Sequence, residues 1–160
     1  MAQGTGAGLV LRYKQVEAAL ADIANVKPRA MGAFRGKLRH LRNIGLPRLP
    51  SPGTGQRIPY SRRQVFEMLL AIELEKMGQA PKSAAMLAQS IVRQAPNGQH
   101  QGQDFYVAIG HDQAAAYTAA YGMPSLSKAI ENASGVCLVI NVSACAMKLD
   151  RALDRVAASG

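Results

Sequence analysis

Apolar residues recur at helical spacing through the first half of the chain. A first amphipathic helix of about three turns is predicted from a stripe at i, i+3, i+4 and i+7, formed by Val16, Ala19, Leu20 and Ile23. After a break at residues 25–27, Pro28 can occupy the first turn of a second helix, because its missing N–H costs nothing there. Gly45 and Pro47 predict that this helix ends near Ile44. Its apolar positions are Met31, Phe34, Leu38, Leu41 and Ile44.

Turn-forming residues then separate two further helices. Residues 46–59 hold four prolines and two glycines, which predict a loop. Ser61 is a suitable N-cap for a strongly apolar helix that ends near Lys76, where Gly78 follows as the stop. A shorter helix is predicted over residues 83–94. The polar, turn-rich residues 96–103 predict a linker between two domains.

The periodicity changes after residue 103. Residues 104–109 predict a strand, and the β-branched residues 135–143 predict a central strand. Helices are predicted over residues 112–121, 125–133 and 148–158. One apolar face of the second strand would comprise Val136, Leu138, Ile140 and Val142, and the opposite face Cys137, Val139, Asn141, Ser143 and Cys145. Because a two-stranded unit is marginal in water, we expect two copies to pair their strands in a dimer.

Composition places the chain among folded globular proteins. Of its 160 residues, 48% are hydrophobic and 18% are charged, which excludes disorder throughout the chain. The length fits one domain, or two small domains that share a core. No apolar run approaches the roughly 18 residues of a membrane-spanning helix, and the Gly-rich residues 1–9 predict a flexible tip rather than a signal sequence. We therefore expect a soluble, cytoplasmic protein with no membrane partner.

The net charge of +9 is concentrated in one part of the chain. Residues 1–95 carry 15 Lys and Arg against 5 Asp and Glu, whereas residues 96–160 carry 4 against 5. Ten cations and no acid lie between Lys27 and Arg63. Such a stretch repels itself unless an anionic polymer neutralises it, and a phosphate backbone is the commonest such partner. The alternative is a solvated basic face that only aids solubility.

The order of these features resembles the winged helix-turn-helix domain of the MerR family of bacterial transcription regulators. Residues 25–31 are similar to that family's turn and the start of its recognition helix, and residues 38–46 to the end of the same helix. Residues 55–61 are similar to the wing, and the resemblance covers about residues 12–80. Between Met31 and Leu38 this chain has two extra helical turns, and its mixed α/β tail replaces the family's long dimerisation helix.

The resemblance implies DNA binding through a domain over residues 10–95. The pattern of strands and helices after it predicts an α/β dimerisation or ligand-sensing domain over residues 104–160. The expected fold class is α+β and mostly helical, with about two strands in the C-terminal domain. The recognition helix would carry a cationic ridge, while the wing and the start of the next helix would grip flanking phosphates. The implied DNA-binding residues are Lys27, Arg29, Arg35, Lys37, Arg39, His40, Arg42, Arg57, Arg62 and Arg63.

Other chemistry has little support in the sequence. Cys137 and Cys145 are spaced like the thiolate pair of metal-sensing MerR proteins, but along one strand they would lie roughly 25 Å apart at ~3.3 Å per residue, too far to share an ion. His40, His100 and His111 are scattered without a cluster of other ligands, so no metal site is predicted. Since there is no nucleophile elbow and no Gly-rich phosphate loop after a strand, we expect neither an enzyme nor a cofactor.

The sequence therefore predicts a homodimeric, sequence-specific regulator of transcription that binds double-stranded DNA. The alternative is a phage or mobile-element accessory protein that uses the same winged helix architecturally, in recombination or packaging. A large preference for one duplex over competitor DNA would distinguish the regulator from this alternative.

Overall fold

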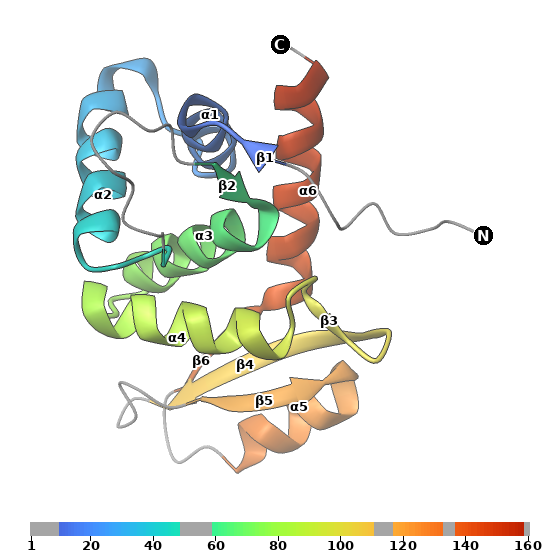
Figure 1. The fold of residues 1–160 in the computed structure, drawn as a ribbon. Helices are drawn as coiled ribbons and strands as arrows, with labels where there is room; N and C mark the ends of the chain where they lie inside the picture. Colours follow the sequence, from blue (N-terminus) through green and yellow to red (C-terminus); the bar gives the residue numbers. More distant parts are fainter. Residues whose placement is uncertain (1–9, 49–58, 111–116, 133–136, 159–160) are drawn as a thin grey trace.

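The computed structural model describes residues 10–48, 59–110, 117–132 and 137–158 (Figure 1). The predicted flexible tip at residues 1–9 and the wing tip with Arg57 lie outside the described residues. Within them, the helices are α1 (Tyr13–Ile23), the 3₁₀ turn η1 (Pro28–Ala30), α2 (Met31–Asn43), α3 (Arg62–Lys76), α4 (Pro81–Gln94), α5 (Gly122–Glu131) and α6 (Val142–Ala158). The strands are β1 (Val10–Leu11), β2 (Tyr60–Ser61), β3 (Gln99–His100), β4 (Gln103–Gly110), β5 (Thr118–Tyr121) and β6 (Cys137–Asn141). The expected class, α+β and mostly helical, is confirmed.

Local sequence explains where the helices of the first half begin and end. α3 begins after Ser61, whose hydroxyl accepts a hydrogen bond from the backbone N–H of Gln64, while the Gln64 side chain accepts one from the N–H of Ser61. α4 begins at Pro81, two residues before the predicted start, because proline suits the first helical turn. Gly45 and Gly78 end α2 and α3 with positive φ angles of 87° and 91°.

Two antiparallel sheets accompany the helices. In the smaller sheet, β1 pairs with β2, so the residues before α1 lie beside those before α3. In the larger sheet, β4 pairs with β5 along one side and with β6 along the other, and β3 forms a hairpin with the start of β4. α5 covers one face of this sheet, and α4 and α6 lie on the other (Figure 1). The prediction of about two strands was wrong, since four strands form this sheet.

The helix predicted over residues 112–121 was wrong at its C-terminal end, and its first residues lie outside the described ranges. Thr118–Tyr121 form β5 instead, with Tyr121 opposite Phe105 of β4. The rings of these two residues stack with their centroids 5.4 Å apart. Cross-strand pairing and this stack outweigh the helix propensity of the alanines in the segment.

The strand predicted over residues 135–143 ends at Asn141, and α6 begins six residues before its predicted start. The side-chain oxygen of Asn141 accepts a hydrogen bond from the backbone N–H of Ala144, which caps the first turn of α6. Val142, Ser143 and Cys145 therefore belong to the helix, and their assignment to strand faces was wrong. The reason is that the capping asparagine stops the strand where β-branched composition alone would continue it.

One apolar core joins both ends of the chain. α6 packs against α1 and α3 as well as against β4. Val16 and Leu20 of α1 lie in the same buried cluster as Leu149 and Leu153 of α6. Residues 96–103, predicted as a linker, contain β3 and the turn that leads into β4. The core therefore crosses the boundary predicted between the two parts of the chain.

A close approach between backbones lies where the turn after α4 meets the start of α6. Gly98 has a φ of +77°, and a Cβ added to it would lie 2.4 Å from the Cβ of Ala146. The buried hydroxyl of Ser143 donates a hydrogen bond to the carbonyl of Gly98 and accepts one from the N–H of Phe105 at 2.8 Å. These contacts join the turn, β4 and α6 at one point of the core.

Candidate nucleic-acid interface

One face of α2 packs against the core, and the opposite face is exposed to solvent. Its buried residues, Phe34, Leu38 and Leu41, belong to the main core. The helix predicted from Pro28 is α-helical only from Met31, because the residues before it form the 3₁₀ turn η1. In Figure 1, α2 lies at the outer left edge of the ribbon. Core packing therefore fixes the direction in which its remaining side chains point.

Two residues of the predicted cationic ridge, Arg35 and Arg42, contact α1, while the third, Arg39, lies nearer the outer surface of α2. The Nε of Arg35 is 2.9 Å from Oε1 of Glu17, and the guanidinium of Arg42 lies over the ring of Tyr13, 5.5 Å from its centroid. Burial and the nearby Glu17 raise the pKa of Tyr13, while the three arginines oppose this rise. Arg39 is exposed, and its side chain makes no ion pair within the described ranges. Sequence reasoning missed Tyr13, which the fold brings to this ridge from α1.

Lys37 lies on the opposite side of α2, next to α3. Its Nζ is 3.0 Å from Oε2 of Glu75, whose other carboxylate oxygen is buried without a hydrogen-bond partner in the described part of the chain. Lys27 and Arg29, just before α2, are exposed and line a shallow groove together with Lys37. Of these three cations, Lys37 is thus held within the fold and the other two face outward.

The outer surface of α2, between these two sides, carries two glycines. Gly32 and Gly36 are four residues apart and exposed, and a Cβ added to either would meet no atom within 4 Å. Arg39 and His40 follow on the next turn, and both are exposed. Glycine in the interior of an exposed helix costs about 1 kcal/mol relative to alanine. The two glycines leave the backbone of α2 open to close approach from outside.

The first two residues of α3, both predicted to bind DNA, have different surroundings. Arg62 forms a bidentate ion pair with Asp150 of α6, in which two guanidinium nitrogens lie 2.6 and 2.9 Å from the two carboxylate oxygens. It also donates a hydrogen bond to the carbonyl of Pro96 at 3.1 Å. Its side chain is only 20% exposed. Arg63 is half exposed, and its Nε lies 3.6 Å from Oε1 of Glu67. Arg62 therefore connects α3 to α6, whereas Arg63 borders a pocket.

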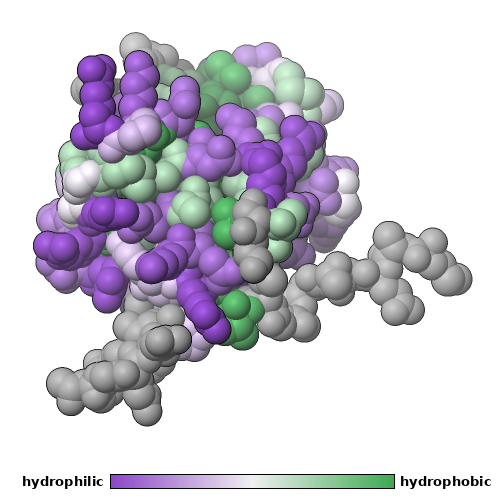
Figure 2. Space-filling view, turned by 90° about the horizontal axis from the view of Figure 1, so that it is seen from above, coloured by the Kyte–Doolittle hydropathy of each residue, from purple (hydrophilic) through white to green (hydrophobic). Residues whose placement is uncertain are grey.

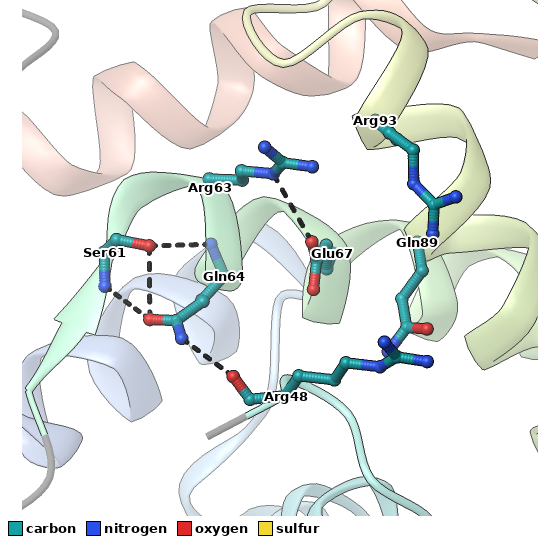
Figure 3. Close-up of a pocket in the computed structure, with 7 residues that line it drawn as sticks. All are labelled: Arg48, Ser61, Arg63, Gln64, Glu67, Gln89 and Arg93. Atoms are coloured by element: carbon teal, nitrogen blue, oxygen red, sulfur yellow. Dashed lines mark hydrogen bonds and ion pairs between the residues drawn. The ribbon is translucent and has the colours of Figure 1, made fainter. Parts of the chain in front are cut away.

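This pocket, of about 340 Å³, lies between α3, α4 and the segment after α2 (Figure 3). Arginines from all three elements line it: Arg48, Arg63 and Arg93. Glu67, which is 9% exposed, is the one carboxylate among the described residues that line it. Sequence reasoning missed Arg48 and Arg93 as site residues, because no helical or strand spacing connects positions so far apart in the chain.

Burial raises the pKa of Glu67 above its ordinary value, although Arg63, Arg48 and Arg93 act in the opposite direction. The folded protein therefore binds this proton more tightly than the unfolded chain, and the resulting contribution to stability is lost as the pH rises from 4.5 through the raised pKa. We expect Glu67→Gln to raise the thermal unfolding temperature at neutral pH and to change it little below pH 4.5. Circular dichroism melts at the two pH values measure this. A lower unfolding temperature of the variant at neutral pH would contradict it.

Within the described residues, the remaining sequence-based candidates do not come together in one site. Cys137 lies in β6 and Cys145 in α6, both as free, partly buried thiols, and burial and the charge of Glu73 raise the pKa of Cys145 to about 11. Among the described residues, no three His, Cys, Asp or Glu side chains gather into a group that could hold a metal ion. His111 lies outside those residues. In the described ranges, no helix has both the length and the apolar character needed to cross a membrane.

No protein-family model matches the chain, and no curated protein is significantly similar to it. The function must therefore be inferred from the surface of the molecule. Figure 2 shows the end at which α1 and the C-terminal end of α6 lie, and hydrophilic side chains spread over much of this face. The cations of η1 and α2 and the arginine-lined pocket are charged features from which a partner can be inferred.

Proposed function

We propose that the protein is a transcription regulator that binds double-stranded DNA through α2, as a homodimer. The observation that carries this proposal is the outer surface of α2, where Arg39 and His40 stand beside the open backbone at Gly32 and Gly36. The element order β1, α1, α2, β2 and α3, with β1 paired to β2, is compatible with the MerR-like winged helix-turn-helix that the sequence resembles.

The distribution of charge on α2 supports DNA as the partner. The helix carries four Lys and Arg and no acid. Two of these cations, Arg35 and Lys37, pair with carboxylates of neighbouring helices and so help to hold α2 in place. Arg39 on α2 and the exposed Arg29 before it remain available for phosphates or base edges.

The two glycines support α2 as the element that enters a groove of the duplex. Larger side chains at these positions would hold the helix backbone farther from the bases. The fold itself gives no steric reason for glycine at either position, because the space around both is open. Glycine at these positions lowers the stability of the helix relative to alanine. A gain in DNA affinity would explain why glycine is nevertheless present there.

Gly36→Ala and Arg39→Ala test this function. We expect Gly36→Ala to increase the free energy of unfolding by about 1 kcal/mol, and yet to weaken binding to the preferred duplex about tenfold, because it hinders close approach. If Arg39 reads a base, Arg39→Ala should weaken the free energy of binding to the preferred duplex by about 1–3 kcal/mol. If Arg39 contacts a phosphate, the variant should reduce the slope of log affinity against log salt concentration by about one unit. Selection from a random duplex pool supplies the preferred sequence, and fluorescence anisotropy at two salt concentrations measures the affinities.

Arg151→Ala is the matched control, since it removes another exposed arginine from a helix, α6, on the other side of the molecule (Figure 1). It should leave both affinities unchanged. If Gly36→Ala and Arg39→Ala also leave them unchanged, α2 is not the recognition helix. If the wild-type protein binds every duplex equally, the architectural accessory protein is the better description.

The homodimer is part of the same proposal. β6 pairs with β4 and has no second partner strand in the described part of the chain, and its Val139 is 36% exposed. A second copy that pairs along this edge would extend the sheet and cover the exposed strand. The two copies of α2 in the dimer would then bind two half-sites on the duplex. Sedimentation of the protein–duplex complex gives the stoichiometry, and a single chain per duplex would contradict the dimer.

A further inference from the structure

The pocket between α3, α4 and the segment after α2 has an excess of positive charge. Among the described residues, three arginines and one glutamate line it, which gives these residues a net charge of +2. Only Arg63 lies within ion-pair distance of Glu67, at 3.6 Å. In the described residues, neither Arg48 nor Arg93 has a carboxylate within ion-pair distance, and Figure 3 shows both side chains reaching into the pocket toward Gln89. Two guanidinium groups are therefore available to an anion that enters.

The backbone around the pocket is held by two glutamines. The Nε2 of Gln64 donates a hydrogen bond to the carbonyl of Arg48 at 3.2 Å, and the Nε2 of Gln89 donates one to the carbonyl of Gly45 at 3.4 Å. These bonds hold the segment after α2 against both α3 and α4. The main-chain position from which the Arg48 side chain extends is thus set before any ligand binds, which lowers the entropic cost of binding.

We propose that this pocket binds a phosphate group. The charge of +2 matches a phosphate dianion, and tetrahedral oxygens can accept hydrogen bonds from guanidinium groups that arrive from three directions. A planar carboxylate is matched best by a single guanidinium fork. The volume of about 340 Å³ is at the lower end of small-molecule sites, so the group can belong to a phosphorylated small molecule or to a DNA backbone. This site goes beyond the proposed function, because it does not include the outer surface of α2.

Glu67 acts as an internal competitor for the arginines. In the empty pocket its carboxylate offsets part of the repulsion among three cations. An entering phosphate takes over this role, and the negative charge of Glu67 then opposes the negative charge of the ligand. The pocket therefore predicts effects of opposite sign: loss of an arginine weakens phosphate binding, and loss of the Glu67 charge strengthens it.

Titration of the full chain with inorganic phosphate, and separately with sulfate, tests the proposal. Calorimetry gives the affinity, and backbone amide chemical shifts locate the site. We expect saturable binding that Arg93→Gln or Arg48→Gln weakens about tenfold or more, and that Glu67→Gln strengthens severalfold. Lys128→Gln is the control, since it removes one positive charge from α5 on the far face of the sheet and should leave the affinity unchanged.

Two results would overturn the proposal. One is the absence of saturable phosphate binding in the wild type and in Glu67→Gln alike. The other is phosphate binding that Arg93→Gln weakens no more than Lys128→Gln does. Both outcomes are independent of α2, because Arg39→Ala can abolish or spare DNA binding without changing either of them.

A second arm of the experiment identifies the source of the phosphate. If duplex DNA displaces inorganic phosphate from the wild type, and Arg93→Gln weakens all duplexes equally, the pocket holds a backbone phosphate. If the preformed protein–duplex complex still binds inorganic phosphate with unchanged affinity, the pocket serves a phosphorylated small molecule.

Discussion

Gly98→Ala is expected to lower the free energy of unfolding by about 2–5 kcal/mol, a large fraction of the stability of a typical domain. A Cβ at this position would lie 2.4 Å from the Cβ of Ala146 and 3.2 Å from the carbonyl oxygen of Val142. Because both atoms belong to the start of α6, the helix itself would have to shift, and overpacking of this kind costs about 1–3 kcal/mol. The positive φ adds about 1–2 kcal/mol for a residue with a side chain.

Gly102→Ala is a matched control, because it separates the two costs. Gly102 has the same φ of +77°, but a Cβ there would meet no atom within 4 Å. We expect this variant to lose only the backbone contribution of about 1–2 kcal/mol. Urea unfolding of both variants measures the difference. Equal losses would show that the turn after α4 does not press against α6 as closely as the structure indicates.

Arg62→Ala is expected to lower the free energy of unfolding by about 2 kcal/mol. Its guanidinium forms two charge-assisted hydrogen bonds with Asp150 and a third bond with the carbonyl of Pro96. These contacts connect α3 to α6 and to the turn after α4, and the side chain is mostly buried. The sequence predicts that Arg62 binds a phosphate. In the structure its guanidinium instead bonds to Asp150 and to the carbonyl of Pro96.

Arg155→Ala is the comparison for Arg62→Ala. Arg155 also pairs with an aspartate of another helix, Asp22 of α1, but its side chain is 61% exposed. Exposed pairs contribute less than about 1 kcal/mol, so we expect a small loss. A double-mutant cycle with Asp150→Ala isolates the coupling between Arg62 and its partner. A coupling energy near zero would mean that Arg62 stabilises the protein only through packing.

The helices of the first half were predictable because periodicity, caps and breakers agree there. The stripe of α1, the Ser61 cap and the terminal glycines each act within a few residues, which a sequence displays directly. The pairing of β1 with β2 escaped prediction, because two-residue strands carry no periodicity.

The second half was less predictable because its elements depend on distant partners. Thr118–Tyr121 is a strand only because β4 lies beside it, and alanine-rich composition alone favours a helix. At the start of α6, the local cap at Asn141 competes with a β-branched run, and composition does not reveal which of the two prevails.

The candidate sites also differ in whether the sequence could predict them. The ridge of Arg35, Arg39 and Arg42 could be predicted, since helical spacing alone places these residues on one side of α2. The pocket of Arg48, Arg63 and Arg93 could not, because it exists only where three separate elements meet. The acidic partners of these cations could not be predicted from the sequence either, because the stretch from Lys27 to Arg63 contains no acid. In the structure, Glu17, Glu75 and Asp150 form ion pairs with its cations from other helices.

The contact between α6 and α1 has a consequence for synthesis on the ribosome. About 120 residues separate the end of α1 at Ile23 from the start of α6 at Val142, which corresponds to on the order of 10 seconds of translation at about 5–20 residues per second. During this time the apolar stripe of α1 emerges without the helix that covers it in the finished fold. The nascent chain thus exposes a basic, half-covered helical unit, and such a unit is a natural client for chaperones that hold apolar segments near the exit tunnel.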